Sequence, residues 1–258
     1  METSEKVAFI HIPKTGGTYL AQKEGGISDS TYDSVISPLI YFNHVAVLVD
    51  VNNTLSWAGP RIPKEPLKNM YVCSSVRNVY SWLTSWFVHR DRIPKPDGKP
   101  PDKTIMDIFE DCVKELIDTS PLKWPSRGFL FRQMWADDAD LIVQWVNHQE
   151  TLDDDLKDLA ILKNLTYKTA PKMRVQNITD YRLYYNDKLV SLVESTWKRD
   201  LVLFGYEFET SLPNLKRAMI KRKITDEYKK IRYNWKTDDI VLSNNNLLNN
   251  LRKDSVSK

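Results

Sequence analysis

The chain has 258 residues, 41% hydrophobic and 28% charged, which is typical of a folded globular protein with a substantial core. The first residues are polar and no apolar run approaches bilayer length, so the sequence predicts no signal peptide, no membrane span and a cytoplasmic location. The net charge of +3 is uneven, because residues 216–258 carry twelve basic and five acidic side chains. We expect a solvated polar extension there, with steering of an acidic ligand as the alternative.

The first half of the chain alternates apolar strands with helices. The run KVAFIHI at residues 6–12 predicts a buried strand, followed by the loop PKTGGT and a short helix from about Thr18. Residues 69–76, NMYVCSSV, predict a second buried strand. Helical spacing of apolar residues from Val79 predicts a helix directly after it. Residues 92–103 hold four prolines, which predicts an irregular loop.

The second half continues this alternation. Thr104, with Asp107 three residues later, predicts a capped helix. Residues 139–146, ADLIVQWV, predict a third strand, and Thr151 opens another capped helix. The last clear helix is predicted at residues 187–206. Strands that alternate with helices predict an α/β fold with a central, mainly parallel sheet.

The predicted organisation is one domain at residues 1–210 and a basic extension at residues 211–258, which we expect to be helical and partly packed on the domain. Cys73 and Cys112 occupy apolar positions, so we expect buried, reduced thiols. The acidic triplet Asp153–Asp155 opens a predicted helix, where the helix dipole favours negative charge. We therefore predict no metal site there.

The loop after the first strand has the composition of an anion-binding site. A strand that ends in a glycine-rich turn and opens a helix presents backbone N–H groups at the positive end of a helix dipole. Gly16 and Gly17 allow the backbone to approach a tetrahedral anion closely. Lys14 adds a charge, and Thr15 and Thr18 add hydroxyl donors. Because the lysine precedes the glycines, the Walker A order is not present, and a tight turn without ligand is the alternative.

A second group of candidate residues follows the second strand. Arg77 stands at the carboxyl end of that strand, and Ser85 lies eight residues later in the next helix. Both side chains reach one anion only if the chain bends back over it. Taken alone, Arg77 is equally suited to a structural ion pair.

Together the two segments resemble the sulfotransferases that use 3′-phosphoadenosine 5′-phosphosulfate (PAPS), and in particular the branch of carbohydrate sulfotransferases with its bacterial relatives. In that family a loop similar to HIPKTGGT holds the 5′-phosphosulfate, and an R-N-x6-S segment in the next strand–helix unit holds the 3′-phosphate. A weaker likeness extends in patches over residues 6–208. Gln144, Asn147 and His148 depart from the Asp, Gly and Arg that are common in the family.

The resemblance implies a P-loop-like, three-layer fold and transfer of the sulfuryl group from PAPS to an acceptor hydroxyl, or secondarily an amine. It implies that Lys14 stabilises the leaving phosphate. No metal is needed, because the sulfuryl group carries a single charge. The residues implied in binding PAPS, or its product 3′,5′-adenosine bisphosphate, are Lys14, Thr15, Gly16, Gly17, Thr18, Tyr19, Arg77 and Ser85, with Lys172 and Arg174 from a late loop.

The acceptor must also lose a proton, and we expect a histidine to take it. The carbohydrate branch carries its catalytic histidine between the two phosphate motifs, in the interval that holds His44. An imidazole near its ordinary pKa suits this role at neutral pH. His89 is the second choice and Asp91 the third, whereas His11, in the strand before the loop, is expected to be structural. His148 is the remaining histidine.

Two other classes of function stay open. A P-loop nucleotide kinase or hydrolase would place Thr15 on Mg²⁺, but the upstream glycine spacing and an acidic strand end are missing. A non-catalytic anion-binding module would use the basic extension, although few aromatic residues are interleaved there and no nucleic acid is expected. The expected acceptor is a small-molecule, glycan or lipid-linked hydroxyl, with residues 92–103 as a candidate lid. The oligomeric state is not predicted.

Overall fold

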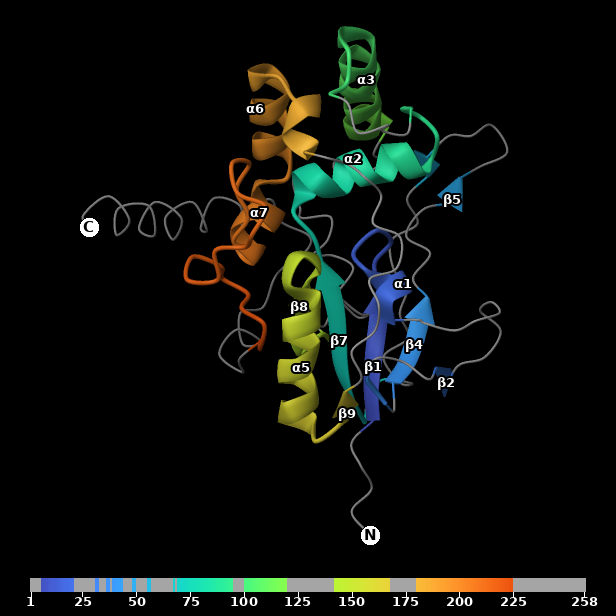
Figure 1. Cartoon of the computed structure of the whole chain (residues 1–258), viewed down its shortest axis with the longest axis vertical. Helices are drawn as coiled ribbons and strands as arrows, with labels where there is room; N and C mark the ends of the chain where they lie inside the picture. The colour runs from blue at the N-terminus through green and yellow to red at the C-terminus, as the bar shows by residue number, and fades with distance from the viewer. Residues whose placement is uncertain are drawn as a thin grey trace, which may run out of the picture. The chain divides into compact units, whose positions relative to one another are not determined.

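The computed structural model in Figure 1 describes residues 6–20, 31–32, 36–37, 39–43, 48–49, 55–56, 67, 69–94, 100–119, 142–167 and 180–224. The chain divides into two compact units, Met1–Lys223 and Ile224–Lys258. The strands are β1 Lys6–His11, β2 Thr31–Tyr32, β3 Ile36–Ser37, β4 Leu39–Asn43, β5 Leu48–Val49, β6 Leu55–Ser56, β7 Met70–Val76, β8 Trp145–His148 and β9 Thr166–Tyr167. The helices are α1 Gly17–Leu20, α2 Val79–His89, α3 Lys103–Thr119, α5 Leu152–Lys163, α6 Asp187–Thr196 and α7 Lys198–Phe204, with 3₁₀ turns η3 Gln149–Thr151 and η4 Tyr181–Tyr184.

The first unit is built on a mixed sheet with the strand order β2-β4-β1-β7-β8. Neighbours among β4, β1, β7 and β8 pair in parallel, and β2 pairs antiparallel with β4. The α/β class predicted from the sequence is therefore confirmed. Side chains on both faces of β1, from Val7 to Ile10, are 0% exposed. A parallel strand covered on both faces needs apolar residues at every position, which explains the unbroken run in the sequence.

Helix α5 covers one face of this sheet. Its three leucines at helical spacing pack against β1, β7 and β8, and burying each of them contributes about 2 kcal/mol. This core consists of Val7, Phe9, Tyr71, Cys73, Trp145, Leu152, Leu156 and Leu159.

A second, aromatic cluster joins α2 to α3 and η4. Phe109 of α3 makes edge contacts with Phe87 of α2, at 6.0 Å between ring centroids, and with Tyr185 after η4, at 5.0 Å. Tyr80 of α2 meets Phe208 at 4.9 Å. Edge-to-face pairs of this kind stabilise the packing beyond the energy of burial. They therefore hold α2 against α3 and η4, next to the end of β7.

The connections between strands diverge at the neighbouring pair β1 and β7. These neighbours are parallel, but the chain goes from β1 to β4 on one side of the sheet and from β7 to β8 on the other. In open α/β sheets, ligands bind outside the carboxyl ends of two strands whose connections diverge in this way. Figure 1 shows the loop after β1 and the start of α2 at this edge.

The predicted cap of α3 at Thr104 is wrong. The helix begins one residue earlier, at Lys103. The carboxylate of Asp102 accepts the N–H of Ile105 at 2.9 Å and thus satisfies one of the free donors of the first turn. Aspartate and threonine are both good capping residues, and Asp102 is the one that lies directly before the first residue of the helix.

The single helix predicted at residues 187–206 is also wrong, because the helix breaks at Trp197 into α6 and α7. The hydroxyls of Ser195 and Thr196 both donate to the carbonyl of Leu192, at 2.9 and 2.6 Å. Side-chain bonds of this type compete with the backbone N–H groups of the helix and bend it.

The third strand lies later than predicted. Of residues 139–146, the first three lie outside the described residues, and β8 runs only from Trp145 to His148. Before β8, the N–H of Val72 in β7 donates to the side-chain oxygen of Gln144, whereas in a regular ladder it would donate to a backbone carbonyl of the neighbouring strand. Thr151 precedes α5 as predicted, but its hydroxyl donates to Asp155 at 3.1 Å and makes no capping bond.

The end of the first unit lies against its sheet and α7. Residues 211–223, grouped with the basic extension in the sequence, belong to this unit. The N–H of Ile220 donates to the carbonyl of Leu203 at 2.8 Å, and the carbonyl of Arg222 accepts the N–H of Val146 at 2.7 Å. The predictions for residues 225–258 lie outside the described residues.

Two further expectations can be compared with the structure. Cys73 and Cys112 are buried and free, as predicted, and burial raises the pKa of each thiol. Within the described ranges, no helix combines the length and apolarity that crossing a membrane requires.

Candidate functional site

The loop after β1 has a constrained backbone. Lys14 has φ +67° and Gly16 has φ +99°, both in the left-handed region. For a lysine this conformation costs roughly 1 kcal/mol, and such strain persists only where the surroundings fix it. The hydroxyl of Thr15 is fully buried and donates to the carbonyl of Ile12 at 2.7 Å. That hydroxyl therefore closes the loop on itself.

The two glycines of the loop make room for other parts of the protein. A Cβ on Gly16 would lie 2.7 Å from the side chain of Leu152 in α5. A Cβ on Gly17 would lie 2.1 Å from the imidazole of His11. At distances this short the neighbouring side chain would have to shift, and Gly16 also has a φ that other residues rarely adopt, so packing and backbone conformation favour glycine at both positions whether or not an anion is bound. His11 packs against the loop, which agrees with the structural role expected for it.

Arg77 and α2 hold the same loop from the neighbouring strand. The guanidinium Nη1 of Arg77 donates to the carbonyl of Lys14 at 3.4 Å, and its Nε donates to Ser81 at 2.8 Å. The indole of Trp82 donates to the carbonyl of Pro13 at 2.9 Å. The two motifs linked in the sequence thus meet at the carboxyl ends of β1 and β7.

The cations in this region are close enough to affect each other. Partial burial and, to a smaller extent, the charge of Arg77 together lower the pKa of Lys14 to about 8. Burial also lowers the pKa of Arg77, which Glu150 and Tyr206 oppose. Two neighbouring cations repel, and an anion between them would relieve the repulsion. The site therefore favours a negatively charged ligand.

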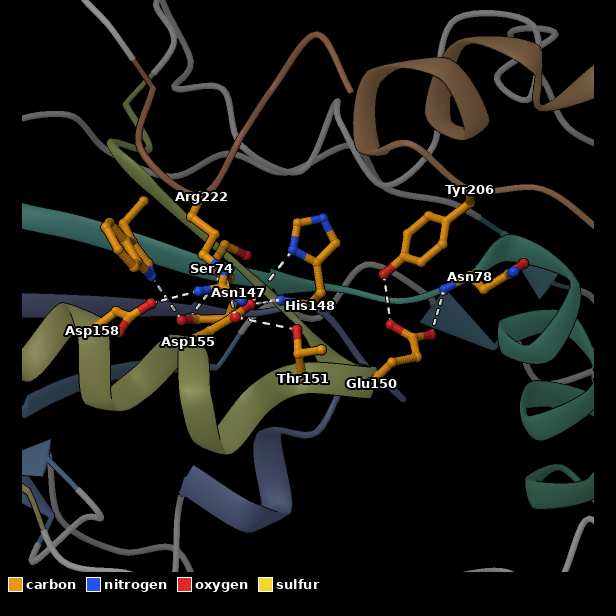
Figure 2. Close-up of polar contacts among 11 residues, drawn as sticks. Ser74, Asn78, Asn147, His148, Glu150, Thr151, Asp155, Asp158, Tyr206 and Arg222 are labelled. Atoms are coloured by element: carbon orange, nitrogen blue, oxygen red, sulfur yellow. Dashed lines mark hydrogen bonds and ion pairs between the residues drawn. The ribbon is translucent and has the colours of Figure 1, made fainter. Parts of the chain in front are cut away.

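A carboxylate that has no role in the sequence predictions lies near Arg77. Glu150 accepts the backbone N–H of Asn78 at 2.9 Å through Oε1 and the hydroxyl of Tyr206 at 2.6 Å through Oε2 (Figure 2). Burial raises the pKa of Glu150, while these two hydrogen bonds and the charge of Arg77 act in the opposite direction.

One sequence signal could have identified Glu150. It stands two residues after the end of β8, the parallel neighbour of β7, which Arg77 follows. Because parallel strands end at the same edge of a sheet, an acidic residue just after β8 is expected near Arg77.

The other predicted residues divide into three groups. Ser85 is buried and lies one helical turn beyond Ser81 on the same side of α2. The hydroxyl of Tyr19 donates to Asp153 of α5 at 2.6 Å, so it ties the segment after the loop to that helix. The side chain of Thr18 and the residues His44, Lys172 and Arg174 lie outside the described residues.

A second polar cluster surrounds the end of β8 and the first turn of α5. Asp155 is fully buried and accepts the backbone N–H of His148 at 2.6 Å, and the Nε of Arg222 lies 2.7 Å from its other oxygen (Figure 2). His148 is also fully buried, which does not suit a base that must meet an acceptor. His89 is exposed at the end of α2.

Among the residues that the structure describes, no three His, Cys, Asp or Glu side chains are grouped to hold a metal ion. Comparisons of the chain with models of protein families, with curated proteins and with solved structures found no match. The functional conclusion therefore depends on the residues and geometry of the site.

Proposed function

We propose that this chain is a PAPS-dependent sulfotransferase with a P-loop-like fold. The observation that carries the proposal is the meeting of the Lys14 loop with Arg77 at the carboxyl ends of β1 and β7. PAPS carries a phosphosulfate and a separate 3′-phosphate, and these two anionic groups require two cationic subsites close together. The position between strands with diverging connections supports a nucleotide ligand there.

In this proposal Lys14 and the loop bind the phosphosulfate. The acceptor oxygen bonds to sulfur while the bond from sulfur to the bridging phosphate oxygen breaks, and the electron pair stays on that oxygen. A cation aimed at this growing charge accelerates such a transfer about 100- to 1,000-fold. Lys14 supplies that charge, and its lowered pKa makes its protonation sensitive to the ligand.

Arg77 and the serines of α2 form the 3′-phosphate subsite. Arg77 uses Nε and Nη1 for Ser81 and the Lys14 carbonyl, and a guanidinium has further donors on Nη2 for a phosphate. Ser81, which Arg77 contacts, and Ser85 lie one turn apart on the same side of α2.

The acceptor proton goes to a base, which we assign to His44. Lys172 and Arg174 complete the nucleotide subsite in the proposal. All three assignments follow from the family resemblance alone. The acceptor is a hydroxyl of a small molecule, glycan or lipid-linked compound.

The contact of Thr15 bears on the alternative of a kinase or nucleotide hydrolase. Such an enzyme needs the hydroxyl after the loop lysine for Mg²⁺. Here that hydroxyl is buried and donates to the Ile12 carbonyl. This favours sulfuryl transfer over metal-dependent phosphoryl transfer.

Thermal-shift titration tests the proposal. A ligand at about 100 times its Kd adds about 2.7 kcal/mol, which raises Tm by about 5–10 °C in a domain of this size. We expect such a shift with 3′,5′-adenosine bisphosphate and PAPS, a smaller one with ATP, and losses in Lys14→Ala and Arg77→Ala. Lys198→Ala, an exposed lysine on α7, is the matched control and should behave as wild type. No shift with the bisphosphate, or an equal shift with ATP, contradicts the proposal.

A further inference from the structure

The turn that carries Arg77 is fixed by hydrogen bonds on several sides. Asn78 caps α2 by accepting the N–H of Tyr80 at 3.1 Å. Its amide Nδ2 donates to the carbonyls of Glu207 and Thr210, at 2.9 and 3.1 Å. Its backbone N–H donates to Glu150. Residues distant in the chain thus converge on this one turn.

The bond from Glu150 acts directly on Arg77. The N–H of Asn78 belongs to the peptide unit whose carbonyl is that of Arg77, and a peptide unit is a rigid plane. A bond to this N–H therefore restrains rotation about the Cα–C bond of Arg77, and with it the direction of the Arg77 side chain relative to the turn. Without it, the peptide between Arg77 and Asn78 is held only through the Asn78 side chain, and the guanidinium can shift away from Ser81 and the Lys14 carbonyl.

Both oxygens of Glu150 are occupied by groups other than Arg77, so Glu150 does not block the remaining donors of Arg77. A carboxylate has only acceptors, and here one oxygen takes the Asn78 N–H and the other takes the Tyr206 hydroxyl. The Nε and Nη1 donors of Arg77 go to other groups, Ser81 and the Lys14 carbonyl. Glu150 thus lies close enough to balance the charge of Arg77 while its oxygens are engaged elsewhere.

We propose that Glu150 is the positioning residue for Arg77, and that it enables the site to select nucleotides that carry a 3′-phosphate. This inference rests on the proposed function, which assigns the 3′-phosphate to Arg77. Glu150 does not touch the ligand; it acts through the turn at Asn78.

The test is a ratio of affinities. Isothermal titration calorimetry gives the Kd of 5′-AMP and of 3′,5′-adenosine bisphosphate, and their ratio measures the benefit of the 3′-phosphate. We expect Glu150→Ala to reduce this ratio by about tenfold while the Kd of 5′-AMP changes less than about threefold. A general loss of structure would weaken both ligands alike. Glu110→Ala removes a hydrogen-bonded carboxylate of α3, which accepts the amide of Asn186, and serves as the control, with the ratio unchanged.

Two further variants separate position from charge. Glu150→Gln can still accept the Asn78 N–H and meet the Tyr206 hydroxyl, so it should keep the ratio within about threefold of wild type. In an Arg77→Ala background, Glu150→Ala should leave the ratio unchanged, because the two residues act through one contact. If Glu150→Ala does not fold, Tyr206→Phe, which releases one oxygen of Glu150, should lower the ratio by about two- to fivefold.

The outcomes also distinguish this inference from the proposed function. If wild type shows no preference for the bisphosphate, the proposed function fails. If wild type prefers it and Glu150→Ala keeps the full ratio, the function stands and the positioning role is wrong. An equal loss in Glu150→Gln and Glu150→Ala would also overturn positioning by hydrogen bonds.

Discussion

The affinity for an anionic nucleotide should fall as pH rises through the pKa of Lys14. In the free protein burial and Arg77 lower this pKa to about 8. A bound anion favours the charged form and restores the pKa toward its ordinary value of about 10.4 or higher. Binding therefore requires proton uptake above about pH 8, and the affinity decreases there because fewer free molecules hold the charge.

The size of the effect follows from the protonated fraction. About one pH unit above its pKa, Lys14 is charged in only about a tenth of the free molecules, so affinity falls by up to about tenfold between about pH 7 and pH 9. Because the side chain is only half-buried, solvent screening reduces this to about three- to tenfold.

Calorimetry with 3′,5′-adenosine bisphosphate over this pH range measures the effect. The ligand's phosphates have a second pKa of about 6, so its charge stays nearly constant. Lys14→Met should bind more weakly at about pH 7 and show no decrease toward about pH 9. A flat profile in wild type, or the same decrease in Lys14→Met, would refute the reasoning.

Three other predictions concern the loop and the base. Gly17→Ala should destabilise the protein by about 1–3 kcal/mol in chemical denaturation, because the added methyl overlaps His11; adding His11→Ala should recover part of this loss, and no recovery would locate the strain elsewhere. Trp82→Phe removes the donor to the Pro13 carbonyl, so it should cost about 1 kcal/mol in the same assay and weaken bisphosphate binding; unchanged binding would mean that the loop is held without it. His44→Ala should bind the bisphosphate normally and lose PAPS turnover, and unchanged turnover would exclude His44 as the base.

The strands and the loop could be predicted from the sequence because their signals are local. The apolar run of β1 and the glycines after it are consecutive residues, and the helix from Val79 has a regular apolar spacing. The meeting of the loop with Arg77 was expected from the family resemblance alone, and it agrees with the rule that parallel strands end at one edge of a sheet.

The rest depended on contacts between distant residues. The reason for Gly17 is the ring of His11, whose direction no sequence pattern gives. Glu150 meets Asn78 across 72 positions of the chain, and its other partner, Tyr206, comes from beyond α7. The break at Trp197 was missed because hydroxyl bonds to Leu192 outweigh a continuous helical pattern.

Conversion of PAPS tests the central claim most directly. The protein is incubated with PAPS and a mixture of phenolic, sugar and sterol alcohols, and release of 3′,5′-adenosine bisphosphate is followed by chromatography. The account predicts release that depends on the alcohols and falls about 100-fold or more in Lys14→Ala. Absence of release by a wild-type protein that binds PAPS, or equal release by Lys14→Ala, would contradict it.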